Sequence, residues 1–202
     1  MKAQWKVALI ALAVTGLAAC KNNPYDPSVS AAASAARTSD KGVDDRSPLT
    51  VITDETFLLE AAKSGMFEVE AGRLALQKTT NPNVRGFANT LVTHHSQANA
   101  EVKMLAQRRN LALPTAIPED KLRQLETLRG LSGDRFDRAF LETVGVGTHR
   151  GDLQLFNREL KYGRDLDVKA FADKTIKLIQ MHHDLAQGLL SGKSLSDFSP
   201  HQ

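Results

Sequence analysis

The chain has 202 residues, of which 42% are hydrophobic, 24% charged and only 5% aromatic. It is long enough for one substantial hydrophobic core, and its composition excludes a collagen-like or wholly disordered protein. Few aromatic residues, beside many Ala and Leu residues, favour helices over a β-sandwich. The single cysteine, Cys20, excludes an internal disulfide framework and a zinc site built from cysteines.

Residues 1–19 have the pattern of an export signal. Lys2 and Lys6 give a positively charged start, and a mostly apolar run follows over residues 7–17. This run is too short to span a bilayer as a helix, because a transmembrane helix needs about 20 residues. We therefore predict a signal peptide that is removed on export rather than a permanent anchor.

The sequence LAAC at residues 17–20 resembles the lipobox of bacterial lipoproteins. In that motif cleavage falls just before the cysteine, which is lipidated, so Cys20 would hold the mature protein at a membrane. Lys21 follows the cysteine, where an aspartate would resemble an inner-membrane retention signal. We therefore expect an outer-membrane lipoprotein facing the periplasm. The alternative is an ordinary signal peptide with an incidental cysteine.

The mature chain is predicted to hold a tether, one helical domain and a short tail. Removing Lys2 and Lys6 with the signal lowers the basic side chains from 26 to 24, against 23 acidic ones, and leaves no dense basic run. We therefore expect no nucleic-acid partner.

Residues 20–49 are rich in Ala, Ser, Asp and Pro and cannot bury enough apolar surface to offset the entropy of ordering, so they are predicted to be a flexible tether. The helical domain is predicted over residues 50–192, with a polar tail over residues 193–202.

From Thr50 onward, apolar residues recur with the 3.6-residue period of amphipathic helices. Thr53 or Asp54 can cap the first helix, and Pro82 opens the second. The predicted helices cover residues 54–78, 82–109, 119–129, 133–162 and 165–190. The apolar face of the helix over residues 133–162 is predicted to comprise Phe136, Phe140, Val146, His149, Leu153, Phe156 and Leu160.

Four long helices, each with one apolar face, predict an all-α four-helix bundle. The short junction at residues 81–82 makes the first two helices antiparallel neighbours. The connection over residues 110–132 is long enough to cross the length of a 28-residue helix, about 42 Å. We therefore predict a crossover that leaves the second and third long helices parallel, as in ferritin-like bundles, with the short helix inside the crossover.

Each long helix carries, on its apolar face, one side chain that can bind a metal. In chain order these are Glu68, His95, His149 and His182. All four lie near the midpoints of their helices, so we expect them at one level of the bundle. One carboxylate and three imidazoles in a dry core suit a transition metal ion such as Zn, Fe, Cu or Ni. The pattern thus predicts a site for one such ion.

A second interpretation of these four residues needs no metal. Buried carboxylate and imidazole groups must find hydrogen-bond partners, so a Glu–His network in a structural or interaction module would also explain them. The Glu-x-x-His pairs of di-iron bundles are absent, because Val92, Val146 and Ile179 stand three residues before the histidines. The chain also lacks Gly-x-Gly-x-x-Gly, P-loop, Cys-x-x-Cys and His-Glu-x-x-His motifs. These absences favour a protein without catalytic activity, and we assign no catalytic residue.

From residue 53 to residue 190 the chain resembles a bacterial family called domain of unknown function 4142. Four segments carry the resemblance: EAAKSGMFEVEAGRLA (60–75), VRGFANTLVTHHSQANAEVKMLA (84–106), GDRFDRAFLETVGVGTHRGDLQLF (133–156) and DVKAFADKTIKLIQMHHDLA (167–186). The resemblance implies a ferritin-like fold at the outer membrane. It also implies that the family's recurring glutamate and histidines correspond to Glu68, His95, His149 and His182.

Two positions depart from the family's pattern. The family often has an aspartate before the histidine of the second helix, where this chain has His94, which offers an additional ligand. It often has a proline in the fourth helix, where this chain has Lys177. From all of these features we expect an exported envelope lipoprotein whose bundle binds a metal ion in a binding or stress-related role, or else serves as an interaction module.

Overall fold

The computed structural model describes residues 52–198, and the regular structure in this part of the chain is helical. The predicted signal peptide, the tether and the lipidated Cys20 lie outside the described residues. Within residues 52–198, none of the helices combines the length and the apolar character that a membrane crossing requires.

Helices α1 (Asp54–Lys78) and α2 (Pro82–Arg108) form an antiparallel hairpin at the predicted boundaries. The Thr53 side chain caps α1 by accepting a hydrogen bond from the Thr56 amide. The Asn81 side chain likewise accepts hydrogen bonds from the first amides of α2. Because short polar side chains can satisfy the amides that begin a helix, these caps set both starting points.

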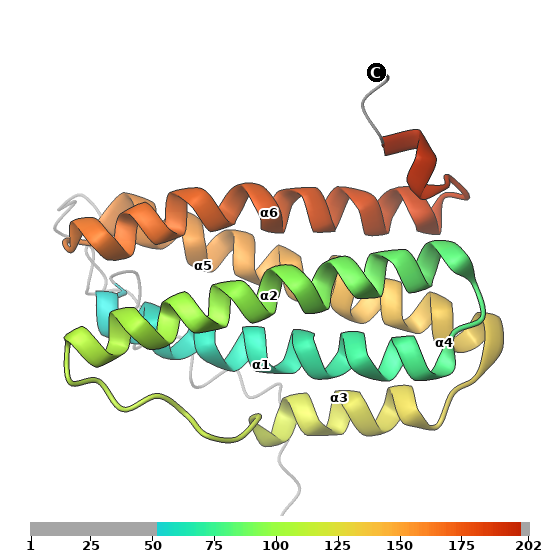
Figure 1. Cartoon of the computed structure of the whole chain (residues 1–202), viewed down its shortest axis with the longest axis horizontal. Coiled ribbons are helices and arrows are strands. Elements are labelled where there is room, and N and C mark those ends of the chain that lie inside the picture. The colour runs from blue at the N-terminus through green and yellow to red at the C-terminus, as the bar shows by residue number, and fades with distance from the viewer. Residues whose placement is uncertain (1–51, 199–202) are drawn as a thin grey trace, which may run out of the picture. The chain divides into compact units, whose positions relative to one another are not determined.

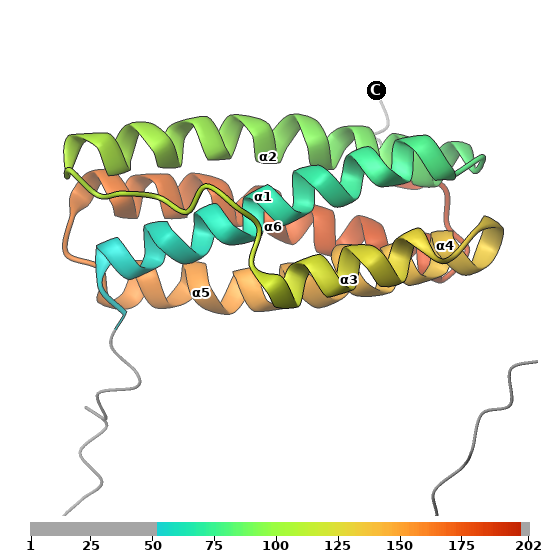
Figure 2. The ribbon, with the colours of Figure 1, turned by 90° about the horizontal axis from the view of Figure 1, so that it is seen from below.

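The connection after α2 returns the chain along the bundle before the next long helix begins (Figures 1 and 2). It contains α3 (Glu119–Arg129), which packs onto the core through Leu125 and Leu128. The third long helix then runs in the same direction as α2 (Figure 2). This parallel pair is the geometry of a crossover bundle, so the predicted topology is confirmed.

The third long helix differs from the single α-helix that we predicted. It consists of α4 (Gly133–Phe140), a π-helical segment η2 (Leu141–Thr148) and α5 (His149–Tyr162). Val144 and His149 stand five residues apart and are both buried. In an α-helix with 3.6 residues per turn they would point in very different directions, whereas the wider π turn brings such positions onto one face.

The π segment also changes the predicted apolar face. Val144 is fully buried, whereas Val146, which we placed inward, is only partly buried. Gly145 lies so close to α6 that a Cβ atom there would overlap Ala186 and press on Phe87. The glycine therefore lets η2 and α6 approach each other closely.

Helix α6 (Leu166–Leu190) completes the bundle, with the Asp165 side chain capping its first amides. Contacts with the bundle continue past residue 192, the predicted end of the domain. Residues 195–198 form a short 3-10 helix, η3, and the Leu195 amide donates a hydrogen bond to Asn83 Oδ1. Leu195 also packs against Gly86 of α2. Phe198 packs likewise against Gly188 of α6, so the two large apolar residues of this segment, Leu195 and Phe198, both contact the bundle.

The hydrophobic core is divided into two clusters along the bundle. One cluster is built around Phe67, Phe87, Phe136 and Phe140. The other is built around Phe57, Phe156 and Phe171, whose rings contact one another with centroids 4.8–6.1 Å apart. Along α2, the third long helix and α6, the predicted histidines stand between residues of the two clusters, and on α1 Glu68 directly follows Phe67. The fold therefore encloses a polar layer between two apolar ends.

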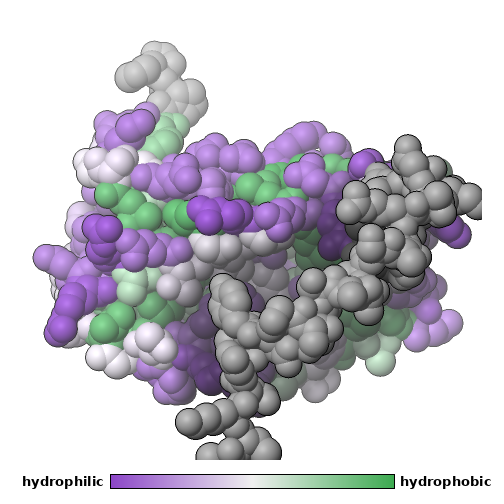
Figure 3. Space-filling model, turned by 180° about the vertical axis from the view of Figure 1, so that it is seen from behind, coloured by the Kyte–Doolittle hydropathy of each residue, from purple (hydrophilic) through white to green (hydrophobic). Residues whose placement is uncertain are grey.

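The molecular surface is mostly hydrophilic on the face seen in Figure 3, with hydrophobic side chains gathered in smaller, separate areas. The large hydrophobic residues exposed on the described part of the chain come from three helices. They are Met104 on α2, Leu122 on α3, and Leu166 and Met181 on α6. Scattered residues of this kind are normal on a folded protein.

Candidate metal centre

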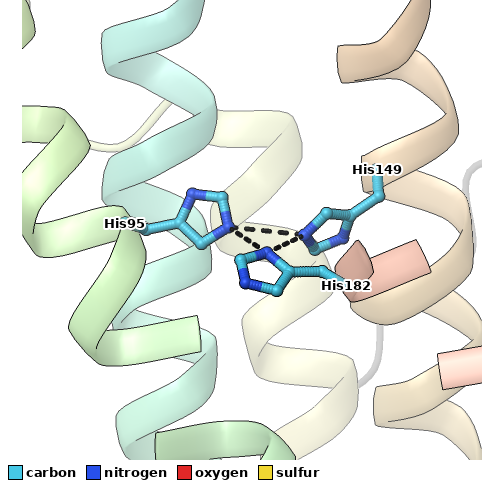
Figure 4. A group of neighbouring side chains, drawn as sticks. All are labelled: His95, His149 and His182. Atoms are coloured by element: carbon cyan, nitrogen blue, oxygen red, sulfur yellow. Dashed lines mark hydrogen bonds between the residues drawn. The ribbon is translucent and has the colours of Figure 1, made fainter. Parts of the chain in front are cut away.

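Three imidazole rings meet in the polar layer (Figure 4). They belong to His95 on α2, His149 at the start of α5 and His182 on α6, and we call them the three-histidine cluster. Nε2 of His95, Nε2 of His149 and Nδ1 of His182 face one another at separations of 3.2–3.3 Å. All three residues are buried, so these nitrogen atoms converge away from solvent.

In two of the rings, an oxygen atom outside the cluster determines which ring nitrogen carries the hydrogen. Nδ1 of His95 lies 2.9 Å from Glu68 Oε2, and Nδ1 of His149 lies 2.8 Å from the carbonyl oxygen of Val144. A carboxylate and a carbonyl only accept hydrogen bonds, so each Nδ1 carries the hydrogen. Nε2 of each neutral ring then presents a lone pair to the centre.

His182 has a different kind of partner, because its Nε2 lies 2.9 Å from Nδ1 of His94. If His182 donates to His94, its Nδ1 becomes the third lone pair directed at the centre. Three lone pairs then face one another with no hydrogen between them, an arrangement that a cation stabilises. In the other tautomer, His94 donates to His182, and Nδ1 of His182 carries a hydrogen that His95 and His149 can accept.

The spacing of the three nitrogen atoms fits a metal ion. Histidine nitrogens bind zinc at about 2.0–2.1 Å, and in a tetrahedral site two such nitrogens are about 3.3 Å apart. The observed separations of 3.2–3.3 Å match this value. The cluster is therefore already arranged as three corners of a tetrahedral site.

Glu68 lies beside the cluster as a buried carboxylate. Its Oε1 is 3.4 Å from Nε2 of His149 and has no hydrogen-bond donor while its neighbour Asp152 is ionised. The Asp152 carboxyl group lies within hydrogen-bonding reach of Glu68 and accepts a bond of 3.0 Å from Ser64 Oγ. The lone pairs of Glu68 Oε1 that lack a partner would be satisfied by a proton shared between the two acids or by a cation.

Burial raises the pKa of both acids. For Glu68, burial is the main cause of the rise. Burial together with the adjacent Glu68 carboxylate raises the pKa of Asp152 well above its usual range. The pair therefore keeps a proton that isolated acids would release at neutral pH, and the charge that remains on the pair lies beside His95 and His149.

The histidines are neutral for the same reason. Burial lowers the pKa of His95 to about 4, and burial with the neighbouring rings lowers the pKa of His182 to about 2. Burial also lowers the pKa of His149. Neutral imidazole is the form that coordinates metal ions, so the cluster needs no deprotonation at pH 7.

The structure brings the four predicted residues together but gives them unequal positions. The three rings form the convergent group, and Glu68 contacts His95 and His149 from outside it. Asp152 is not among the predicted site residues, although it follows His149 by only three residues. Residues three apart share a helix face, so a search for His-x-x-Asp, the reverse of the pairs sought, would have found it.

The sequence profile of the family called domain of unknown function 4142 matches residues 32–189. The chain belongs to this family. The match includes α1 to α5 and nearly all of α6, so the candidate metal centre lies wholly within the family's domain. No curated protein sequence matches this domain of unknown function 4142 protein significantly.

Several solved structures share this fold at low sequence identity. A domain of unknown function 305 fragment from Deinococcus radiodurans has a TM-score of 0.62 at 14% identity, covering 68% of this chain and 95% of that one. A protein of that family from Streptomyces coelicolor has a TM-score of 0.60 at 14% identity, with coverage of 74% and 96%. CopM in its Cu(II)-bound form has a TM-score of 0.61 at 15% identity, with coverage of 70% and 98%. These likenesses establish the fold alone, a ferritin-like helical bundle.

Proposed function

We propose that this domain of unknown function 4142 protein binds one transition metal ion in the three-histidine cluster. The observation that carries the proposal is the triangle of ring nitrogens, 3.2–3.3 Å on each side. His95 and His149 each use their other nitrogen to donate to an oxygen, which leaves lone pairs at the centre. A bound ion would supply a positive charge that these lone pairs and the Glu68 carboxylate share.

Copper and zinc are the first ions to test. Imidazole ligands suit Zn, Cu, Fe and Ni, and among divalent first-row ions Cu(II) generally binds a given site most tightly. CopM, which shares the fold, has a structure in a Cu(II)-bound form. The nitrogen spacing is equally suited to zinc, because it matches the tetrahedral geometry that zinc prefers.

The metal content of the purified protein tests the proposal. We expect one metal ion per chain, measured by elemental analysis after purification without a histidine tag and saturation with Cu(II) or Zn(II). The His149→Ala variant should retain none, while His183→Ala, which changes a histidine outside the cluster, should retain one ion. Circular dichroism would establish that each variant is folded. Equal metal content in wild type and His149→Ala would remove the proposed site.

A metal-free hydrogen-bond network is the alternative function of these residues. The tautomer of His182 that carries a hydrogen on Nδ1 favours it, because His95 and His149 could both accept that hydrogen. This module would bind no ion at saturating Cu(II) or Zn(II). Nitrogen NMR would then show the hydrogen of His182 on Nδ1 rather than Nε2.

We further propose that the protein is exported and attached to the outer membrane through lipidated Cys20. The LAAC sequence at residues 17–20 supports this proposal. A relative in fold, from Streptomyces coelicolor, is named as a candidate secreted protein, which supports export. The Cys20→Ser variant should appear in the soluble fraction, and a variant that stays in the membrane fraction would contradict lipidation at this residue.

A further inference from the structure

A small internal cavity lies beside the three-histidine cluster. It has a volume of about 20 Å³, and its walls include Glu68 and His95. That volume is enough for one water molecule or one ion, because a site for a single water needs about 10–15 Å³. Glu68 and His95 therefore border a space that can hold one small ion beside the cluster.

Two surface pockets share residues with this cavity. The first, of about 390 Å³, shares Ser64 and Asp152 with it. The second, of about 400 Å³, shares Asn99 with it. Either pocket could lead to the cluster, and their charges and polar groups distinguish them.

The first pocket has the chemistry of a cation entrance. Its walls come from α1, the start of α3, the end of η2 and α5, and they carry the acids Glu60, Asp120 and Asp152. Of its two lysines, Lys63 is paired with Glu60 at 2.6 Å, and Lys121 lies over the ring of Phe67.

Oxygen atoms line the step from this pocket to the cavity. Ser64 Oγ donates to Asp152 Oδ2 over 3.0 Å, and both residues belong to the walls of both spaces. By contrast, the second pocket has Lys103 in its wall and no acidic residue. The first route therefore offers an incoming cation acidic side chains together with its two lysines, whereas the second offers a lysine without an acid.

We infer that metal ions enter the bundle through the first pocket, past Ser64 and Asp152, and reach the cluster by way of the internal cavity. This inference rests on the proposed function, because it concerns how the same site is loaded. It assigns a transient cation-binding role to a surface pocket that the metal centre itself does not require. Blocking the pocket should slow loading without changing how many ions bind.

Gly151 offers a place to block the pocket without disturbing the core. It lies in the pocket wall, and a Cβ atom there would have no neighbour within 4 Å. We would add Co²⁺, whose visible absorption reports coordination, to metal-free full-length protein in mild detergent. We expect uptake by Gly151→Trp to be at least tenfold slower than by wild type, with the same final stoichiometry. Gly151→Leu, a smaller side chain, should give an intermediate rate.

The matched control is Gln107→Trp, which places the same side chain in the wall of the second pocket. This variant should take up Co²⁺ at the wild-type rate. An unchanged rate in both Gly151 variants, or slowing by Gln107→Trp as large as that by Gly151→Trp, would overturn the route while leaving the metal site intact. If wild type itself binds no Co²⁺ at saturation, the proposed function fails, and the route fails with it.

Discussion

The three histidines of the cluster are each held by a different kind of partner. Glu68 holds His95 with a carboxylate, Val144 holds His149 with a backbone carbonyl, and a fourth histidine holds His182. The two oxygen partners allow one tautomer of their ring, whereas His94 allows both tautomers of His182. At the scale of single residues, His94 therefore decides whether the centre presents three lone pairs or two.

Replacing His94 should weaken metal binding without removing a ligand of the cluster. Partners that orient a ligand typically contribute 10–100-fold to metal affinity, so we expect His94→Ala to lose about that factor. Competition with a chromophoric chelator would measure the change. The neighbouring control His183→Ala should stay close to wild type, since His183 contacts Asp184 rather than the cluster. Equal affinities for wild type and His94→Ala would mean that this contact does not orient His182.

Replacing Asp152 should stabilise the metal-free protein. Burial and Glu68 raise the pKa of Asp152, so at neutral pH the folded state must keep a proton that the unfolded state has released. Asparagine can accept from Ser64 and donate to Glu68 without that proton. We therefore expect Asp152→Asn to unfold at higher urea concentration than wild type at pH 7. The advantage should shrink toward pH 4, and an advantage that does not depend on pH would contradict the reason given.

At the scale of elements, the π-helical segment η2 places the ligand of the third helix. His149 follows η2 directly, and the Nδ1 hydrogen bond to Val144 spans five residues. Thr148 Oγ1 donates over the same five-residue step to the carbonyl of Thr143. The wider turn thus orients His149 toward the cluster while Val144 stays in the core.

Gly145→Ala tests the packing of this segment. A methyl group there would overlap Ala186 on α6, so we expect a loss of about 1–3 kcal/mol in the free energy of unfolding. Metal affinity should also fall. Moving η2 away from α6 would increase the distance between His149 and His182. The control, Gly151→Ala, adds a methyl group in open space and should be neutral or stabilising by up to about 1 kcal/mol. Similar stabilities for the two variants would exclude a close contact at Gly145.

The end of the bundle opposite η3 contains another buried acid, Glu159. Burial raises the pKa of Glu159 to about 8, and the nearby Asp54 carboxyl group contributes to the rise. Asp54 in turn accepts hydrogen bonds from the amides of Arg164 and Asp165, which join α5 to α6. The acid pair therefore lies where α1 begins and α5 ends.

The stability of this end should depend on pH. In the unfolded chain a glutamate has a pKa of about 4.3, so the folded state binds the extra proton between that pH and about 8. The contribution of Glu159 is therefore fully present below about pH 4 and is lost as pH rises to about 8. In urea unfolding, the free energy of unfolding of Glu159→Gln relative to that of wild type should rise between pH 5 and pH 8. For the control Glu55→Gln, which changes an exposed glutamate, the difference from wild type in the free energy of unfolding should stay constant across that range.

At the scale of the whole molecule, the polar layer separates two apolar clusters, and all four long helices contribute to it. Filling this layer with an ion should therefore stabilise the entire bundle rather than one helix. At a free metal concentration of 100 times Kd, binding adds about 2.7 kcal/mol to the free energy of unfolding. For a domain of this size we expect the midpoint of thermal unfolding to rise by about 5–10 °C.

Circular dichroism melts with a chelator and with excess Cu(II) or Zn(II) would measure this rise. His149→Ala should melt at one temperature under both conditions. A rise of similar size in His149→Ala would place the ion elsewhere on the chain.

The sequence by itself determined the helices, the crossover and the four polar positions. Helical period, caps such as Thr53 and Asn81, and the distance of each residue from a turn are local properties that can be read along the chain. The tertiary structure alone decided which nitrogen of each ring faces the centre, that Asp152 joins Glu68, and that η2 turns Val144 inward. These features depend on contacts between helices, such as that of Gly145 with Ala186, and no single helix specifies them.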